Sequence, residues 1–490
     1  MITRADIPES VLTVAQTLEQ AGFEAYLVGG CVRDLYLSKE PKDWDITTNA
    51  KPEEIEVLFE DTYCNNEYGT VGVVNEDVAD ERLKVVEVTP YRTESGYSDN
   101  RRPDEVVFGV SLEEDLKRRD FTVNAIAFRP ATEETVDLFD GAGDITKKRL
   151  KTVGNPDERF GEDALRMMRA IRLAAELNFA IESDTMAAIS RNANILSRIS
   201  AERIRDEFLR IINSPVPMQG IVLLERLSLI EYILPEIKDS IGCEQGGIHA
   251  YDVYEHLLRT CQAAADKGFS TEMRLAALLH DIAKPATRRE GGKNKRYSFF
   301  GHEAVGAKMT RKILERLKLP RDIAQKVENL VRWHMFFADP DEITLAAVRR
   351  TVVRIGEENI EDLLNLRVCD RIGTGRPKEQ PFRFRKYKAM VDQARRDPVS
   401  VKMLKTNGDR IMNTYGEKPG KRLGYVLHAL LEEVLEDPSV NTEEYLDTRT
   451  KALLELEISD LEALAKQGKA KQAAEEAAEI KAIERAHKVG

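Results

Sequence analysis

The stretch from Tyr26 to Asp45, YLVGGCVRDLYLSKEPKDWD, constrains the fold of this chain more than any other. An apolar segment enters a Gly-Gly turn, and a second apolar segment begins with a D-x-D pair. Because side chains two residues apart on a strand share a face, Asp43 and Asp45 are predicted to direct both carboxylates at one point, as ligands of Mg²⁺ must. A glycine pair at a strand-to-helix turn lets backbone N–H groups approach a phosphate. A surface turn before a solvated acidic strand end would also explain these residues.

Composition indicates a globular protein with several domains. The 490 residues exceed one ordinary core and suggest about three or four domains or helical modules. No run of about 18 apolar residues is present, so no membrane span is expected. The five cysteines form no C-x-x-C pair and the N-terminus lacks a signal-peptide core, so we expect a cytoplasmic protein. The net charge of −12 argues against indiscriminate coating of nucleic acid but leaves room for a local basic face that binds RNA.

The pattern of residues 1–155 predicts an α+β head domain with a mixed sheet. Apolar residues at helical spacing occupy 1–25, and alternating apolar residues mark strands at 70–74 and 83–89. The segment 91–104, YRTESGYSDNRRPD, lacks an apolar period and is rich in turn-forming residues. We therefore expect a mobile loop there.

No strand pattern follows Pro156, so the remainder of the chain is predicted to be all helical. Within it, one long helix is expected at 158–179. We divide the remainder into four parts, namely a neck at 156–240, a body at 241–395, a tail at 396–458 and a charged C-terminal helix at 459–490.

Nucleotidyl transfer requires a phosphate-binding turn beside a Mg²⁺-binding pair of carboxylates, and an arginine pair could complete such a site. Arg118 and Arg119 precede a predicted strand of the head. A guanidinium binds phosphate in bidentate fashion and keeps its charge at any working pH, so one of the two could hold a triphosphate. A surface pair that caps the preceding acidic helix explains them equally well.

The predicted helix at 158–179 carries charged residues at every third position, namely Asp163, Arg166, Arg169 and Arg172. We expect them to form a polar ridge along one side of a helix that is otherwise rich in Leu, Met, Ile and Ala. Asp and Arg together offer donors and acceptors of the kind that a nucleobase edge presents. A solvated salt bridge is the usual explanation for a single pair of this spacing, but three arginines in the ridge favour a nucleotide-binding surface.

Histidines are concentrated in the predicted body. Four of them are spaced over separate helices, and two aspartates accompany them: His256, His280, Asp281, His302, His334 and Asp370. Imidazoles and carboxylates from several helices can converge on one metal ion inside a bundle. Any one histidine could be an ordinary core residue, but the set in this order favours a metal centre.

Four motifs in order resemble those of the class II tRNA nucleotidyltransferases, the family of CCA-adding enzymes and of the related bacterial poly(A) polymerases. They are GGCVRD at 29–34, DWD at 43–45, RRDFTVNAIA at 118–127 and EDALRMMRAIR at 162–172. The resemblance covers about residues 20–240. It implies a polymerase-β-like head and a Mg²⁺-dependent nucleotidyltransferase that adds CCA to the 3′ end of tRNA. CTP and ATP would be the substrates, pyrophosphate the product, and no nucleic-acid template would be needed.

The resemblance also implies roles for the matching residues of the head. Gly30 and Arg33 would contact the incoming nucleotide, and Arg119 would hold its triphosphate. Asp43 and Asp45 would hold Mg²⁺ and carry the catalysis.

For the neck, the resemblance implies a protein template that selects the base. Asp163 and Arg166 would read the edge of CTP or ATP, while Arg169 and Arg172 would contact nucleotide phosphate or ribose. Glu87, on a neighbouring strand of the head, is a candidate for a third acidic residue.

The body resembles an HD domain, a helical metal-dependent phosphohydrolase fold. The implied metal-binding residues, which suit a second divalent ion of the transition series, are His256, His280, Asp281 and Asp370. His302 and His334 would be further ligands or a base. Some CCA-adding enzymes carry such a domain with phosphatase or phosphodiesterase activity. The domain could equally serve as a tRNA-binding body.

Three other functions stay open at this point: addition of the terminal A alone, poly(A) synthesis, and a main activity as an HD phosphohydrolase. In the resembling family the loop at 91–105 helps to switch from CTP to ATP, and its full length here favours CCA or A addition over CC addition. Basic runs at 284–296, 308–321 and 371–387 could bind RNA, and Phe382, Phe384 and Tyr387 interleave with the last run as in stacking surfaces. The oligomeric state and the role of the C-terminal helix do not follow from the sequence.

Overall fold

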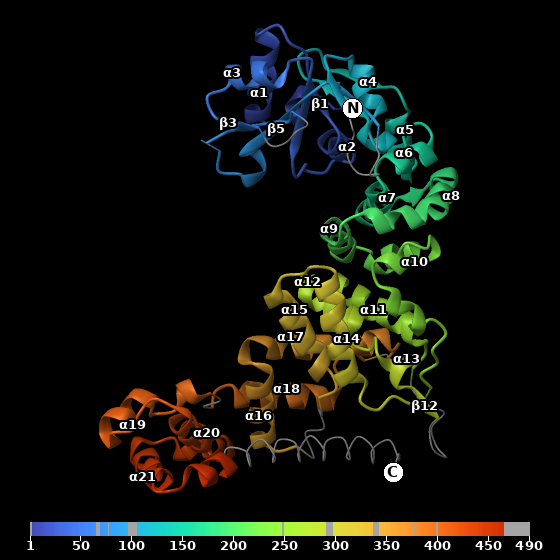
Figure 1. Ribbon diagram of the computed structural model, residues 1–490. Helices are drawn as coiled ribbons and strands as arrows, with labels where there is room; N and C mark the ends of the chain where they lie inside the picture. Colours follow the sequence, from blue (N-terminus) through green and yellow to red (C-terminus); the bar gives the residue numbers. More distant parts are fainter. Residues whose placement is uncertain are drawn as a thin grey trace. The chain divides into compact units, whose positions relative to one another are not determined.

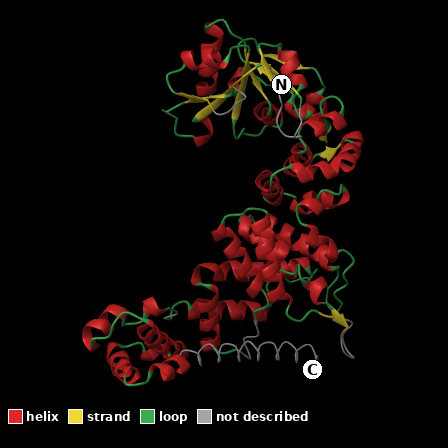
Figure 2. Cartoon of the chain, in the orientation of Figure 1, coloured by secondary structure: helices red, strands yellow, loops and turns green. Residues whose placement is uncertain are grey.

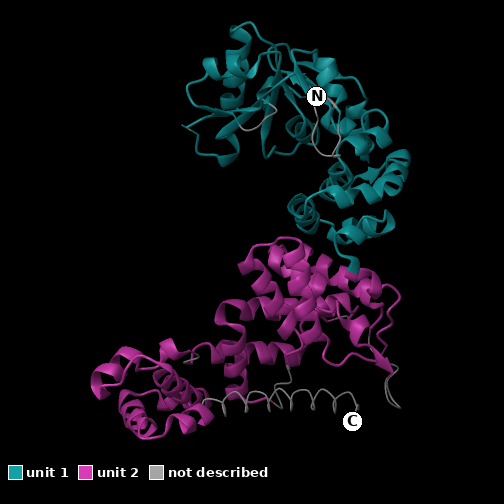
Figure 3. Ribbon diagram, in the orientation of Figure 1, with its two compact units in different colours: residues 1–235 teal, residues 236–490 magenta. Residues whose placement is uncertain are grey.

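The computed structural model forms two compact units, Met1–Pro235 and Glu236–Gly490 (Figure 1, Figure 3). The structure describes residues 2–64, 69–76, 78–96, 105–246, 249–290, 297–336, 343–376, 378–397 and 400–464. Within these ranges no helix is long and apolar enough to cross a membrane. The division falls after Pro235, and the finer five-part division stays a prediction.

A mixed sheet forms the centre of the head, as the sequence predicted (Figure 2). Among the described residues its strand order is β3-β4-β5-β2-β1-β8-β9. The strands are β1 Ala25–Val28, β2 Trp44–Thr48, β3 Thr62–Cys64, β4 Val71–Val74, β5 Val85–Pro90, β8 Ile126–Arg129 and β9 Glu134–Asp137. Strands β2 and β5 pair in parallel, and the other neighbours are antiparallel. Every residue of β1 is buried, which is typical of a central strand with both faces covered.

Short helices surround this sheet and are fixed by local sequence signals. They are α1 Glu9–Gln20, α2 Gly30–Tyr36, α3 Pro52–Leu58, α4 Leu112–Lys117 and α5 Gly141–Thr146. The apolar face of α1 is buried, which stabilises an amphipathic helix through tertiary contacts. Ser111 caps α4, because its hydroxyl accepts the N–H of Glu114.

The prediction that 91–104 forms a loop is wrong for the first residues of this segment. Strands β6 Arg92–Ser95 and β7 Glu105–Phe108 pair as an antiparallel hairpin. Ion pairs of Glu94 with Arg92 and Arg118 stabilise β6 in place of apolar contacts, so an apolar period could not reveal it. Residues 97–104, the remainder of the predicted loop, lie outside the described residues.

The predicted helix at 158–179 is divided in two, which corrects the expectation of one continuous helix. Helix α6 Pro156–Glu162 ends at Asp163, whose backbone is extended, and α7 Leu165–Leu177 follows. The Asp163 carboxylate accepts the N–H of Leu165 at 3.0 Å. Aspartate competes with the helix interior in this way because its side chain satisfies backbone donors at a helix start. Asp163 therefore lies at a junction, and not on the ridge that the arginines of α7 form.

The neck continues with α8 Ser183–Asn192, α9 Ala201–Ile212 and α10 Pro217–Arg226, and α7 packs against α9 and α10. The prediction that no strand follows Pro156 is wrong in detail. Three two-residue strands are present among the described residues, namely β11 Ala180–Ile181, which pairs with β10 Arg149–Leu150, and the pair β12 Arg289–Glu290 and β13 Tyr297–Ser298. Two residues are too few to produce a periodic signal.

The second unit is helical apart from β12 and β13 over its described residues, in agreement with the sequence (Figure 2). Its helices are α11 Val253–Asp266, α12 Thr271–Leu279, α13 Lys284–Thr287, α14 His302–Arg316, α15 Arg321–Trp333, α16 Leu345–Ile355, α17 Ile360–Gly373, α18 Phe382–Ala394, α19 Gly408–Tyr415, α20 Lys421–Glu436 and α21 Glu443–Leu454. Helix α11 packs against α12 and α17, and α15 packs against α12 and α14. Of the predicted C-terminal helix, residues 465–490 lie outside the described residues.

Candidate active site in the head and metal centre in the body

Three carboxylates meet at the start of β2. Asp43 directly precedes the strand and is exposed, and Asp45 is its second residue. In the parallel register of β2 and β5, Asp45 lies beside Glu87. Burial raises the pKa of Asp45 to about 7, and repulsion from Asp43 and Glu87 adds to this effect. A divalent cation relieves such repulsion, so the donor set fits the predicted Mg²⁺ site.

The Gly-Gly turn lies directly against these carboxylates. Gly29 adopts a positive φ of 83°, which favours glycine. A Cβ atom at this position would lie 3.4 Å from Arg119 Nη1 and 3.5 Å from Asp45 Oδ2. A Cβ at Gly30 would lie 3.7 Å from Asp43 Oδ1. The fold thus brings the turn, the acidic pair and Arg119 together, as the motifs predicted.

Arg119 has hydrogen-bonding capacity left for a ligand. Its Nη2 donates to the buried Asp115 Oδ2 at 3.1 Å. Its Nε is buried and has no hydrogen-bond partner among the described residues. Arg118, in contrast, pairs with Asp115 and with Glu94 of β6. Of the two arginines, Arg119 is therefore the one whose geometry suits a phosphate group.

A chain of hydrogen bonds connects the turn to the neck through Asp120, a residue to which the sequence assigned no role. Arg33 Nη1 donates to Asn124 Oδ1 at 2.7 Å, and Asn124 Nδ2 donates to Asp120 Oδ1 at 3.1 Å. Arg169 Nε of α7 donates to Asp120 Oδ2 at 2.8 Å. Burial alone would raise the pKa of Asp120, but the charge of Arg169 and the Asn124 bond hold it below its usual range.

The other predicted nucleotide-binding residues of the neck have different partners. Asp163 Oδ2 pairs with Arg203 at 2.9 Å. Arg166 pairs with Glu162, and its Nη2 also donates to the carbonyl of Arg118 in the head at 3.3 Å. Both side chains are thus held at the junction between head and neck.

Arg172 lies inside the neck. It is 4% exposed, and it pairs with Glu207 at 2.6 Å and with Glu176 at 2.7 Å. These carboxylates engage its guanidinium in the core of the neck. Its contact with a nucleotide stays a prediction that this geometry does not favour.

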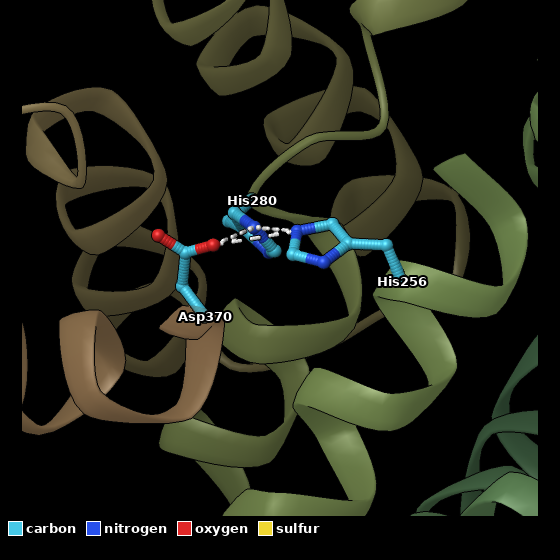
Figure 4. A group of neighbouring side chains, drawn as sticks. All are labelled: His256, His280 and Asp370. Carbon is cyan, nitrogen blue, oxygen red and sulfur yellow. Dashed lines mark hydrogen bonds and ion pairs between the residues drawn. The ribbon is translucent and has the colours of Figure 1, made fainter. Parts of the chain in front are cut away.

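The body brings its predicted metal-binding residues together from several helices. His256 of α11, His280 after α12 and Asp370 of α17 point toward one another (Figure 4). His256 Nε2 lies 3.0 Å from His280 Nε2 and 3.4 Å from Asp370 Oδ1. The ligand atoms of this group lie within 4.8 Å of one another, and both histidines are buried. Imidazole and carboxylate ligands in this arrangement fit a divalent transition metal.

A second group adjoins the first. It consists of Asp281, His302 of α14 and His334 after α15, all buried, with ligand atoms within 4.8 Å of one another. Figure 4 draws the first group only. The structure thus places His302 and His334 beside the other predicted ligands.

Two further polar residues of this centre were missed by the sequence analysis. Lys284 Nζ lies 2.6 Å from Asp281 Oδ2 and donates to Gln245 Oε1 at 2.6 Å. Its position three residues after Asp281 was the available signal. His249 packs edge to face on His256 with ring centroids 5.6 Å apart.

The predicted stacking surface at 371–387 is wrong for two of its three aromatic residues. Phe382 is 70% exposed, but Phe384 and Tyr387 are buried in the core. All three lie on α18, where the one-turn spacing of Phe384 and Tyr387 turns both toward the interior.

The raised pKa of Asp45 predicts a pH-dependent metal affinity in the head. A protonated carboxyl does not bind a cation, so the affinity should fall about tenfold per pH unit below pH 7 and level off above it. Trp44 lies next to Asp45, and the chain has two tryptophans. In a Trp333→Phe variant, quenching of Trp44 fluorescence by Mn²⁺ measures this affinity. Glu87→Gln, which removes one repelling charge, should shift the profile to lower pH, and a flat profile between about pH 5.5 and 8 would contradict the assignment.

Comparison with known proteins assigns the chain to a family. Residues 25–151 match the poly A polymerase head domain, 178–241 a probable RNA and SrmB-binding site of polymerase A, and 248–372 the HD domain. Matches to these head and HD domains imply dependence on divalent metal ions.

Relatives and solved structures agree with these matches. A CCA-adding enzyme of Levilactobacillus brevis is 34% identical over 428 residues, which cover 87% of this chain and 93% of that protein. One from Enterococcus faecalis is 52% identical over 200 residues, 41% of this chain and 48% of that protein. The crystal structure of the Bacillus stearothermophilus CCA-adding enzyme in complex with CTP is 28% identical. It superposes with a TM-score of 0.67 over 91% of this chain and 98% of the other. The resemblance inferred from the motifs is confirmed, and the chain belongs to the family of CCA-adding enzymes.

Proposed function

We propose that this protein adds C, C and A to the 3′ end of tRNA, with CTP and ATP as substrates and pyrophosphate as product. The observation that carries the proposal is the meeting of Asp43, Asp45 and Arg119 at the Gly-Gly turn. The relatives are named CCA-adding enzymes, and one solved relative was crystallised with CTP. We further propose that the protein acts in the cytoplasm, where tRNA is processed.

Asp43 and Asp45 are the proposed ligands of Mg²⁺, and Glu87 is the neighbouring carboxylate that keeps the site strongly negative. When bound, Mg²⁺ supplies charge neutralisation for the triphosphate and activates the tRNA 3′-hydroxyl as a nucleophile. Arg119, with its Nε free of protein partners among the described residues, receives the triphosphate. The 3′-hydroxyl attacks the α-phosphate, and the bond to the pyrophosphate leaving group breaks.

Base selection is proposed to lie with Asp163 and Arg166 at the junction of head and neck. Arg203 and Glu162 hold these two side chains, which restricts their rotamers before a nucleotide arrives. Arg169 serves as a positioning residue through Asp120. Direct contact of Arg172 with phosphate or ribose would require it to leave its present partners.

Incorporation of labelled nucleotides into tRNA that ends at the discriminator base tests the proposal. We expect CTP to be added first and ATP once thereafter. Asp43→Asn and Asp45→Asn should each lower the rate by at least about a thousandfold, because each removes a ligand charge of the catalytic metal. Glu56→Gln on α3 removes an exposed carboxylate of the same domain and should retain full activity.

Other products would identify a different enzyme. Incorporation of ATP alone, and only onto tRNA that ends in CC, would indicate an A-adding enzyme. Long adenylate tails would indicate a poly(A) polymerase. Absence of any incorporation that depends on Asp43 and Asp45 would contradict nucleotidyl transfer itself.

For the body we propose a second activity, metal-dependent hydrolysis of phosphoesters. The observation that favours it is the buried group of imidazoles and carboxylates. Lys284 and Arg367 pair with its aspartates. Arg367 pairs with the candidate ligand Asp370 at 2.7 Å. Burial lowers the pKa of Arg371 and of Arg376, and repulsion from neighbouring guanidinium groups adds to it. Crowded cations of this kind favour an anionic ligand such as a phosphate.

Hydrolysis of p-nitrophenyl phosphate and of 2′,3′-cyclic AMP, with Mn²⁺, Co²⁺ or Ni²⁺ added, tests this second activity. His280→Ala should abolish hydrolysis and leave CTP incorporation unchanged, because His280 lies in the second unit. A protein without hydrolysis under any metal would instead support a body that serves only to bind RNA.

A further inference from the structure

Asp115 of α4 is a buried carboxylate that pairs with both arginines at 118–119. Its Oδ1 accepts hydrogen bonds from Nε and Nη2 of Arg118 at 2.9 and 2.7 Å. Its Oδ2 accepts one from Nη2 of Arg119 at 3.1 Å. Burial alone would raise the pKa of Asp115, but the charges of Arg119 and Arg118 hold it below its usual range. The carboxylate is therefore charged, and its two oxygens bind different arginines.

Strand β2 connects this carboxylate with the acidic site of the head. Thr47 lies two residues after Asp45 on β2, so the two side chains point to the same face of the sheet. The Thr47 hydroxyl lies 3.3 Å from Asp115 Oδ2 and 3.1 Å from the carbonyl oxygen of Thr89 on β5. Asp115 therefore contacts the strand that carries Asp45, on the same face and two residues further along.

Arg119 extends from Asp115 toward the acidic site. While its Nη2 pairs with Asp115, its Nη1 and the Oδ2 of Asp45 would lie 3.4 and 3.5 Å from a Cβ atom at Gly29. Over the described residues, no ion pair joins Arg119 to Asp45, although the positive charge of Arg119 acts on this carboxylate. A guanidinium and a carboxylate this close tend to pair. The pair with Asp115 opposes that contact, and it leaves Nε and Nη1 of Arg119 for a ligand.

We propose that Asp115 is a positioning residue for nucleotidyl transfer, which holds Arg119 away from the metal-binding carboxylates and directs its remaining N–H groups to the triphosphate. The inference rests on the proposed function of the head, in which Arg119 receives the triphosphate. Without the charge of Asp115, Arg119 would pair with Asp45 instead. It would then compete with the divalent cation and withdraw from the phosphates. Asp115 itself does not touch the substrate and acts through Arg119.

Binding of tripolyphosphate, measured by calorimetry with Mg²⁺ present, tests this role without catalysis. Tripolyphosphate resembles the triphosphate of the substrate but has no base, so base selection does not contribute to its affinity. We expect Asp115→Asn to weaken binding about tenfold, because residues of one ion-pair network are energetically coupled. In an Arg119→Gln background the same substitution should have no effect, since the residue through which Asp115 acts is absent. Equal weakening in both backgrounds would indicate a merely structural role and overturn the proposal.

The Mn²⁺ affinity of the head provides a second readout. In the Trp333→Phe background, quenching of Trp44 fluorescence should show weaker Mn²⁺ binding by Asp115→Asn, because Arg119 then pairs with Asp45. Addition of Arg119→Gln should restore the affinity, which a damaged fold would not do. Mn²⁺ binding that Asp115→Asn leaves unchanged, or that Arg119→Gln fails to restore, would overturn the proposal.

Controls separate this role from loss of the fold. Asp144→Asn changes another buried carboxylate that pairs with an arginine, Arg149, and should retain both affinities.

If Asp115→Asn unfolds by circular dichroism, Arg119→Lys tests the same arrangement. A lysine keeps the charge, but its one ammonium group cannot pair with Asp115 and hold the phosphates in the way a guanidinium can, so we expect about tenfold weaker tripolyphosphate binding. Binding as tight as that of the unaltered protein would overturn the proposal. CTP incorporation by the unaltered protein reports on the proposed function separately. If incorporation occurs and these tests fail, the role of Asp115 alone is refuted, whereas absence of incorporation would refute nucleotidyl transfer and this role with it.

Discussion

A single buried carboxylate, that of Asp120, holds the proposed nucleotide site of the first unit together. It accepts hydrogen bonds from the N–H of Phe121, the amide of Asn124 and the guanidinium of Arg169. Removal of one partner from such a pair costs about 3–5 kcal/mol, because an uncompensated charge stays buried. Asn124 in turn fixes Arg33 beside the Gly-Gly turn. The proposed phosphate-binding and base-selecting sides of the site are therefore positioned as one set.

In the body, by contrast, a buried carboxylate is not fully hydrogen-bonded by protein donors. Asp120 is fully compensated by protein donors, whereas Asp281 has an oxygen without a hydrogen-bond partner among the described residues. Lys284 neutralises only the other oxygen directly. A buried charge that protein donors satisfy acts as a structural connection, and one that they leave unsatisfied acts as a ligand. This contrast distinguishes the proposed positioning residue of the head from the proposed metal ligand of the body.

The sequence predicted those features that depend on local periodicity or on motif order. The two-residue period of a strand predicted that Asp43 and Asp45 converge, and the order of the histidines predicted their meeting in the body. The sequence-based prediction was wrong where contacts with residues distant in the chain determine the structure. Arg172 has the spacing of a ridge residue, yet it lies in the core, where it forms an ion pair with Glu207 of another helix. Asp163 interrupts its helix because its carboxylate accepts the N–H of Leu165 and pairs with Arg203, forty residues away. Strand β6 is stabilised by ion pairs, so the pattern of apolar residues could not predict it.

Single-turnover incorporation of CTP and ATP by an Asp120→Asn variant tests the central claim most directly. Asp144→Asn is the matched control, because Asp144 is also buried and paired with an arginine, Arg149, but belongs to α5. The account predicts that Asp120→Asn lowers incorporation of both nucleotides by about tenfold or more, since the loss of one charged contact exceeds 1.4 kcal/mol. Mn²⁺ binding at Asp43 and Asp45 should stay unchanged. Equal incorporation by the two variants would contradict the account.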